Sequence, residues 1–302
     1  MLKILRALLG GPKARTKKLP NFYPSGRLRG RRLDRLLLVL CRFIIPMLLR
    51  SLFFFVVASF GLELSASIRG CDPQYLRQAY SEAHQFAAIE GAPYALLANN
   101  AYATAGTRFQ LPAGWQSLKQ GNEHRQIGLQ YELFGWQESG QTQRLTLAFR
   151  GTDELIDWWH GAITGTQYQQ ALAITAGIRK QYPGLPLVVT GHSLGGGLAL
   201  HVSMLMEQVS AYAFNPSPIT RNPAKPMKNR RVVYWEYDDP LHYGRRLLMQ
   251  VPDAVFWKFD FVKRDGHKSE VLAKGLLMLA ALNNDEYAQT LVRNCDIDPL
   301  SR

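Results

Sequence analysis

The sequence contains few cysteines, and none of them lies in a metal-binding pattern. Cys41, Cys71 and Cys295 are the only three in 302 residues, and no CxxC motif occurs. This usage excludes a zinc ribbon or a disulfide-rich scaffold. Cys71 and Cys295 flank the expected folded region, which leaves a disulfide in an oxidising compartment and two free thiols as alternatives.

The first fifty residues almost lack negative charge. They hold 13 Lys and Arg against Asp34 alone, whereas residues 51–302 hold 23 basic and 22 acidic residues. The net charge of +13 therefore describes a tail rather than a folded domain. A nucleic-acid enzyme carries its basic surface on the folded part, so no nucleic-acid partner is expected. A basic tail beside an apolar tract is typical of a membrane-surface or targeting element.

The tail also lacks an apolar run long enough to cross a bilayer by itself. A spanning helix needs roughly 20 apolar residues, and Ser51–Leu62 provides twelve without a charge. Extending the run back to residue 36 would bury Arg42 and Arg50. A basic flank, a short apolar core and then small residues are typical of a secretory signal or an uncleaved anchor. We therefore expect residues 1–72 to form a basic tail with a signal or anchor segment, and residues 73–302 to form the folded domain.

Two details of this segment bear on location. Met47 opens a stretch with the proportions of a bacterial signal peptide, so Met1 and Met47 are alternative starts. The stretch "SIRGCD", residues 67–72, resembles a bacterial lipoprotein cleavage site at Cys71, although Arg69 departs from the small residue expected there. The segment predicts a protein of the bacterial cell envelope that is membrane-anchored, periplasmic or exported.

The rest of the chain alternates between strand-like and helix-like patterns. Apolar spacing predicts helices over 73–91, 93–103, 167–182, 194–209 and 268–282. Short β-branched and aromatic runs predict strands over 127–136, 144–149, 187–190, 211–215, 232–237 and 254–259, and residues 104–126 are expected to form a loop. This order predicts an α/β fold with a mainly parallel sheet covered on both faces.

The stretch "VVTGHSLGGGLAL", Val188–Leu200, places Ser193 between a predicted strand and a predicted helix. A serine hydroxyl is a weak nucleophile until a base removes its proton. A tight strand–turn–helix elbow exposes the oxygen above the sheet, and the following helix offers free N–H groups to a developing oxyanion. Ser193 is therefore a candidate nucleophile, and the alternative is a purely structural turn.

A second stretch, "LTLAFRGTDELIDWW" at Leu145–Trp159, resembles the oxyanion segment of class 3 (fungal-type) lipases, and the Ser193 elbow resembles that family too. The resemblance covers about residues 90–280. It implies an α/β-hydrolase fold, hydrolysis of lipid acyl esters, and an oxyanion hole built from Thr152 and Leu194. The segment "DELIDWWHGAIT" that follows Thr152 is similar to the family's lid, and an ordinary core helix is the alternative.

The acid and the base should follow the serine in the chain. Asp238 and Asp239 end a predicted strand, and the family resemblance favours Asp239, which is followed by a proline. The alternative is that these two adjacent acids form a polar strand exit or an Asx turn and have no catalytic role. His267 precedes a C-terminal helix, as the base does in the resembling family, and is the preferred base. His84, His124 and His160 precede the serine, and His192 lies inside its elbow. His201 falls on the helix after the elbow, and His242 is too close to Asp239 in the chain.

The preferred interpretation is a serine carboxylic-ester hydrolase, a lipase or phospholipase A that acts through an acyl-enzyme. This mechanism requires neither a metal nor an organic cofactor. Its expected partners are a lipid or ester substrate and a membrane surface. Two alternatives remain, because fold alone does not define function. One is a non-catalytic lipid-binding or scaffolding protein on a degenerate hydrolase fold. The other is a thioesterase or peptidase on the same fold.

Overall fold

The computed structural model describes residues 73–102, 109–111, 113–124, 129–151, 165–262, 266–293 and 296–297. The predicted tail and signal segment, Met47, all three cysteines, Thr152 and the predicted lid lie outside these residues. Within the described ranges, no helix combines the length and the hydropathy that a bilayer crossing requires. The proposed division at residue 72 stays a prediction.

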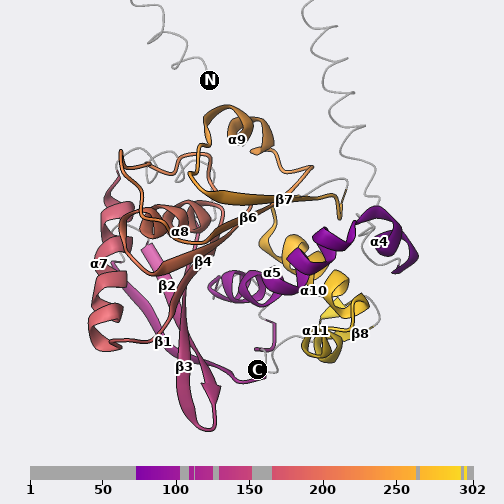
Figure 1. The fold of residues 1–302 in the computed structure, drawn as a ribbon, viewed down its shortest axis with the longest axis horizontal. Helices are drawn as coiled ribbons and strands as arrows, with labels where there is room; N and C mark the ends of the chain where they lie inside the picture. Colours follow the sequence, from indigo (N-terminus) through magenta and orange to yellow (C-terminus); the bar gives the residue numbers. More distant parts are fainter. Residues whose placement is uncertain are drawn as a thin grey trace, which may run out of the picture. The chain divides into compact units, whose positions relative to one another are not determined.

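The core of the fold is a seven-stranded sheet in which the strands lie side by side in chain order (Figure 1). β1 (Trp115–His124), β2 (Leu129–Glu138) and β3 (Gln141–Phe149) are antiparallel neighbours. From β3 onward the pairing is parallel, through β4 (Leu187–His192), β5 (Val209–Phe214), β6 (Arg231–Glu236) and β7 (Ala254–Phe259).

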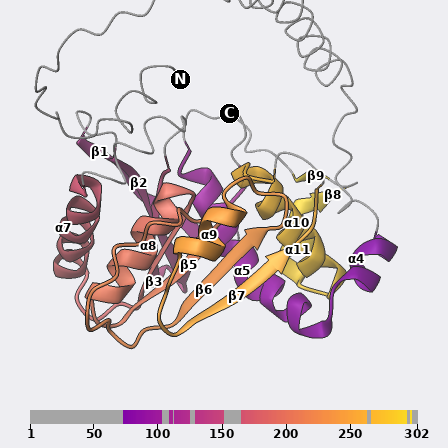
Figure 2. The same ribbon diagram turned by 90° about the horizontal axis from the view of Figure 1, so that it is seen from above.

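Helices cover both faces of this sheet, as Figure 2 shows from above. α7 (Thr166–Gln181) and α8 (Leu194–Leu205) pack on one face, and α5 (Glu82–Asn100) and α10 (Ser269–Leu282) pack on the other. Successive strand residues serve opposite faces: Val232 and Tyr234 join the α5–α10 core, whereas Val233 joins the α7–α8 core. This alternation follows from the two-residue period of a strand. The arrangement confirms the predicted α/β fold, in which a mainly parallel sheet is covered by helices on both faces.

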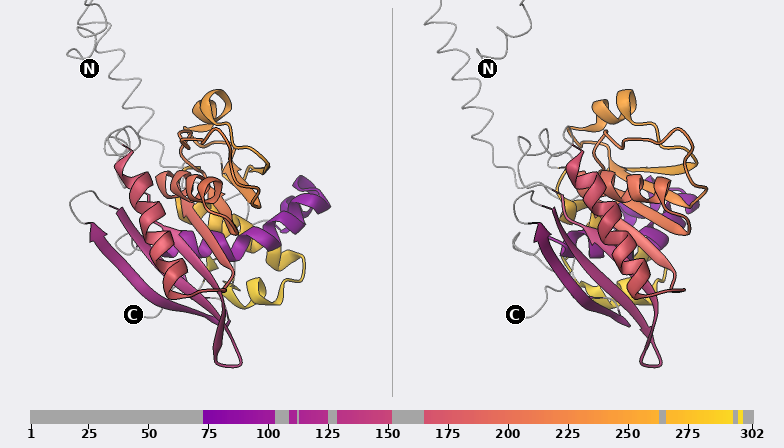
Figure 3. Two further views of the ribbon diagram at one scale, coloured as in Figure 1. Left: turned by 60° about the vertical axis from the view of Figure 1, so that its left-hand side comes forward. Right: turned by 90° about the vertical axis from the view of Figure 1, so that its left-hand side faces the viewer.

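The remaining described elements are short. They comprise α4 (Pro73–Ala79), α9 (His242–Leu248), α11 (Glu286–Leu291), β8 (Val292–Arg293) and β9 (Asp296–Ile297). α9 follows the carboxyl end of β6 and stands apart from the other helices, and the β2–β3 hairpin projects from the opposite end of the molecule (Figure 3). Of these pieces, α4 falls within the helix predicted over 73–91, whereas α9, α11 and the β8–β9 pair were not predicted from the sequence.

Two sequence predictions were wrong in detail. The helix break expected between Gly91 and Pro93 is absent, because α5 runs through both residues and its break from α4 lies at Ser81, whose backbone is extended. Gly91 is instead a contact point, since a Cβ there would collide with the Tyr234 ring. The loop expected over 104–126 contains β1, an edge strand whose polar sequence hides the alternation that identifies buried strands.

Candidate active site

The turn between β4 and α8 holds Ser193 in a backbone conformation that residues with side chains rarely adopt. Its φ is 55° and its ψ is −123°, a strained combination of the kind found at functional sites. The turn closes tightly because Gly191 and Gly195 have no side chains. A Cβ on Gly195 would collide with the carbonyl of Phe149 in β3, and one on Gly191 would collide with Gly195 itself. The glycines flanking the serine are therefore required by close backbone approach.

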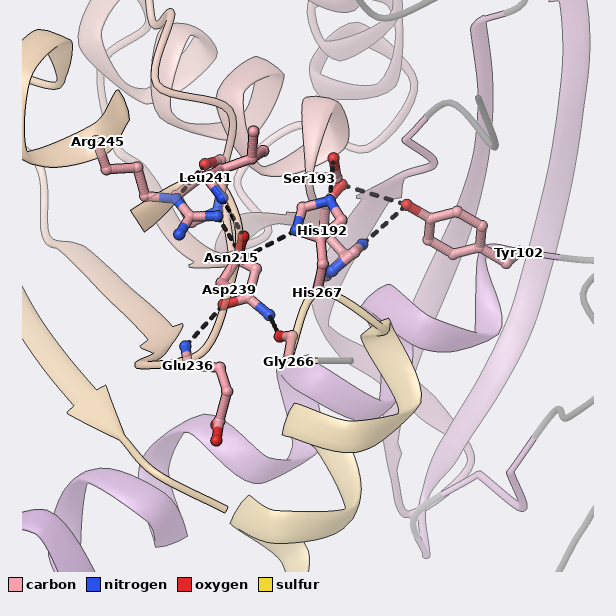
Figure 4. Close-up of polar contacts among 11 residues, drawn as sticks. Tyr102, His192, Ser193, Asn215, Glu236, Asp239, Leu241, Arg245, Gly266 and His267 are labelled. Carbon is pink, nitrogen blue, oxygen red and sulfur yellow. Dashed lines mark hydrogen bonds and ion pairs between the residues drawn. The ribbon is translucent and has the colours of Figure 1, made fainter. Parts of the chain in front are cut away.

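Ser193 lies at one end of a continuous hydrogen-bonded arrangement (Figure 4). His267 Nε2 is 3.0 Å from Ser193 Oγ, and His267 Nδ1 is 2.8 Å from Asp239 Oδ2. A buried carboxylate can only accept, so the Asp239 contact places the imidazole proton on Nδ1 and leaves Nε2 free to accept the hydroxyl proton. The geometry suits general-base activation of the serine.

Asp239 is buried, with 2% of its surface exposed, and each of its oxygens has a donor. Oδ1 accepts from the Leu241 N–H at 2.7 Å, and Oδ2 accepts from Arg245 Nη2 at 2.5 Å as well as from His267. Burial alone raises the pKa of Asp239, but the His267 hydrogen bond, the Arg245 charge and the Leu241 N–H outweigh it and lower the pKa below its usual value. The carboxylate is therefore held ionised.

Arg245 is a member of the site that the sequence analysis did not identify. Its side chain comes from α9 and is fully buried, and its Nε donates to the Pro216 carbonyl at 2.6 Å. In Figure 4 it lies on the side of Asp239 away from His267. No local signal in the sequence marks this arginine, because its role depends on α9 folding back over the end of β6.

A second unpredicted residue, Tyr102, lies on the opposite side of Ser193. Its Oη accepts from the Gly151 N–H at 3.1 Å and is 3.1 Å from His192 Nδ1. The hydroxyl thus joins the residue before Thr152 to the residue before Ser193. Tyr102 fixes the end of β3 against the serine turn.

His192 packs inside the site without replacing His267. Its buried ring lies 4.9 Å from the His267 ring, and burial, reinforced by the neighbouring His267, lowers its pKa to about 3. It therefore stays neutral across the physiological range. His201 contacts the carbonyls of Thr220 and Arg221, which is a structural role away from Ser193.

Buried polar groups fix the loop that carries His267. Asn215 donates to the Gly266 carbonyl at 2.7 Å and accepts from the Glu236 N–H at 2.8 Å, so one amide joins three segments. Glu236 accepts from the backbone N–H groups of Phe261 and Val262. Burial is the main cause that raises the pKa of Glu236 to about 8, with the nearby carboxylates adding to it and the two N–H bonds opposing it.

The structure brings Ser193, Asp239 and His267 together, and it distinguishes the two candidate acids because Asp238 is exposed. Leu194 is the first residue of α8, so its N–H is among those without an acceptor inside the helix. His242 is buried among the rings of Trp235, Tyr237 and Tyr243 rather than at the serine. Among the described residues, no group of His, Cys, Asp or Glu is placed to hold a metal ion.

Comparison with known proteins supports a lipase-like family. Residues 93–233 match the family model described as a Tle-like phospholipase domain. An extracellular phospholipase A1 of Serratia liquefaciens is 30% identical over 37% of this chain and 40% of its own length. The chain thus spans well under half of that relative.

Solved lipase structures are also similar. A triacylglycerol lipase from Penicillium expansum shares 15% identity, with 61% of this chain and 82% of the other covered at a TM-score of 0.43. A lipase from Rhizopus microsporus var. chinensis shares 16% identity, with 64% and 84% covered at a TM-score of 0.39. The family match and the phospholipase A1 relative support the lipase-like resemblance predicted from the two motifs.

Proposed function

We propose that this protein is a serine hydrolase that cleaves acyl esters of lipids, with phospholipids as the preferred class. The observation that carries the proposal is the hydrogen-bonded arrangement of Ser193, His267 and Asp239 at the carboxyl ends of β4, β6 and β7. The phospholipase domain matched by residues 93–233 and the phospholipase A1 relative support the choice of substrate.

In the proposed reaction, Ser193 Oγ attacks the acyl carbonyl carbon while His267 Nε2 takes the hydroxyl proton. His267 then gives this proton to the oxygen of the leaving alcohol, and the carbon–oxygen bond of the ester breaks. Water attacks the acyl-enzyme with His267 again as the base, which releases the fatty acid and restores the serine. Asp239 orients the imidazole and stabilises its protonated form.

Two backbone N–H groups would stabilise the negative oxygen of each tetrahedral intermediate. Leu194 supplies one from the start of α8, and Thr152 supplies the other by its resemblance to the lipase oxyanion residue. Tyr102 supports this arrangement because its hydroxyl holds Gly151 beside the serine turn. Export to the cell envelope, through the segment before residue 73, would bring the enzyme to lipid surfaces, and lipidation at Cys71 is one form of that proposal.

Fatty-acid release from phosphatidylcholine and from a triacylglycerol tests the function. The wild-type chain should release fatty acid and lysophospholipid, and Ser193→Ala should lower kcat by several orders of magnitude, since serine hydrolases lose roughly 10⁶-fold on loss of the nucleophile. Ser210→Ala on β5 is the matched control. A wild-type protein that binds lipid but releases no acyl chain would support a non-catalytic lipid-binding protein instead.

A further inference from the structure

α9 exposes apolar side chains and buries polar ones, the reverse of an ordinary surface helix. His242 and Arg245 are 7% and 1% exposed, whereas Tyr243 and Leu247 are 79% and 81% exposed. At 100° per residue, His242 and Arg245 share one side of the helix, and Tyr243 and Leu247 share the opposite side. The apolar side thus faces away from the protein.

The exposed apolar groups of the described residues gather in this region. Six of the eight large ones lie between positions 237 and 256, and the full set is Phe86, Leu205, Tyr237, Tyr243, Leu247, Leu248, Val255 and Phe256. Ring contacts join α9 to the edge strand β7, because Trp235 lies 6.2 Å from His242 and 5.5 Å from Phe256. A gathered apolar surface of this kind marks an interaction site.

Positive charge flanks the apolar side chains. Arg246 and Lys258 are exposed. Burial is the main cause that lowers the pKa of His242, and the charges of Lys258 and Arg246 lower it further. Lys258 also lies 3.8 Å from the centre of the Tyr237 ring. Asp260 offsets part of the Lys258 charge, and the exposed acid Asp238 follows Tyr237 in the chain. We define the α9 patch as Tyr243, Leu247, Leu248 and Phe256 with Arg246 and Lys258.

We infer that the α9 patch is the surface with which the protein docks on an anionic phospholipid bilayer. Leucine and tyrosine side chains enter the boundary between headgroups and acyl chains, while arginine and lysine bind lipid phosphates. The inference rests on the proposed function for its biological sense, because a lipid surface is the substrate source. The α9 patch lies outside both lipase motifs and outside the predicted lid, so it would be a separate docking element.

The position of α9 connects docking to the site. Its buried side carries Arg245, which bonds Asp239, and its exposed side carries the patch. Both α9 and Ser193 follow the carboxyl ends of parallel strands, so they lie at the same edge of the sheet. A bilayer held against the α9 patch therefore lies at the edge where the serine is placed.

Vesicle flotation of the full chain tests the inference in a Ser193→Ala background, where binding is independent of turnover. Vesicles of phosphatidylcholine with and without phosphatidylglycerol are compared. We expect Leu247→Ser to lower the partition coefficient on the anionic vesicles by about tenfold, the typical effect of losing one buried leucine. Arg246→Gln should reduce the preference for phosphatidylglycerol. Phe86→Ser, an equally apolar exposed change on α5, is the matched control and should bind like its parent.

A local probe separates the patch from any binding by the basic tail. A polarity-sensitive fluorophore is attached through Leu247→Cys after the three native cysteines are replaced by serine. Its emission should shift to the blue on anionic vesicles, whereas the same fluorophore attached through Phe86→Cys should not. No shift at position 247, or a shift caused by self-association without vesicles, would overturn the inference.

Hydrolysis assays distinguish this inference from the proposed function. With Ser193 intact, Leu247→Ser should keep the wild-type rate on a soluble short-chain ester and lose activity only on vesicle phospholipid. Absence of hydrolysis on every ester by the wild type would overturn the function and leave vesicle docking to be decided by flotation. Equal loss on soluble and vesicle substrates would overturn the docking role.

Discussion

Replacing Arg245 by methionine should destabilise the protein and slow the reaction together. Asp239 has three donors, and the change removes the only cationic side chain among them while leaving the carboxylate buried. It also leaves the Pro216 carbonyl without its donor from Nε. Breaking a fully buried ion pair by removing one partner costs about 3–5 kcal/mol. We expect the lower end, because His267 and the Leu241 N–H still bind the carboxylate.

The catalytic effect should follow from the position of Asp239 rather than from substrate contact. Without the arginine the carboxylate can turn, and the imidazole it orients moves relative to Ser193. Displacements of about 1 Å cost up to roughly 100-fold in rate, so kcat should fall while KM changes little. Arg245→Lys keeps the charge without the planar fork and should recover part of both losses.

Urea unfolding followed by tryptophan fluorescence gives the free energy of unfolding, and a soluble p-nitrophenyl ester gives kcat and KM. The matched control is Arg246→Met, the same change at the next position, which is exposed. The control should alter stability by less than about 0.5 kcal/mol. An Arg245→Met protein that is no more impaired than Arg246→Met in unfolding and in kcat would contradict the role given to the buried ion pair.

Three further changes test other parts of the site. Gly195→Ala should lower the free energy of unfolding by about 1–3 kcal/mol or more, because the added methyl collides with the backbone of β3. Gly177→Ala, at an exposed position of α7, should raise it by about 0.5–1 kcal/mol. Urea titration measures both. Burial raises the pKa of Glu236 from 4.5 to about 8, so the folded chain holds this proton more tightly than the unfolded chain. The free energy of unfolding should therefore fall as the pH rises from about 4.5 to about 8, by at most ~1.4 kcal/mol per pH unit. Glu236→Gln should abolish this slope in unfolding measured from pH 5 to 8. Tyr102→Phe should leave the Gly151 N–H without its acceptor and lower kcat on a soluble ester by about tenfold with little change in KM, and an unchanged kcat would contradict its positioning role.

Local patterns identified the parts of the site that depend on neighbouring residues. The Ser193 elbow could be predicted because a strand, two obligatory glycines and a helix start lie within a dozen residues. The carboxyl end of β6 identified the pair Asp238–Asp239, and only the three-dimensional contacts distinguish the buried acid from the exposed one.

The rest depends on contacts between distant segments. Arg245 reaches Asp239 because α9 folds back, and Tyr102 meets Gly151 across 49 positions of the chain. Neither has a local sequence signature. β1 was missed because it is an edge strand that pairs with β2 alone. Many of its side chains are polar, so its sequence lacks the apolar alternation of a buried strand.

Labelling by a fluorophosphonate probe is the most direct test of the central claim, because the probe reacts rapidly only with an activated serine. We expect labelling of the wild type at Ser193, identified by peptide mass spectrometry. Labelling should be lost in Ser193→Ala and in His267→Ala and stay normal in the control His84→Ala. Absence of labelling in a folded wild-type protein, or labelling that survives Ser193→Ala, would contradict this claim.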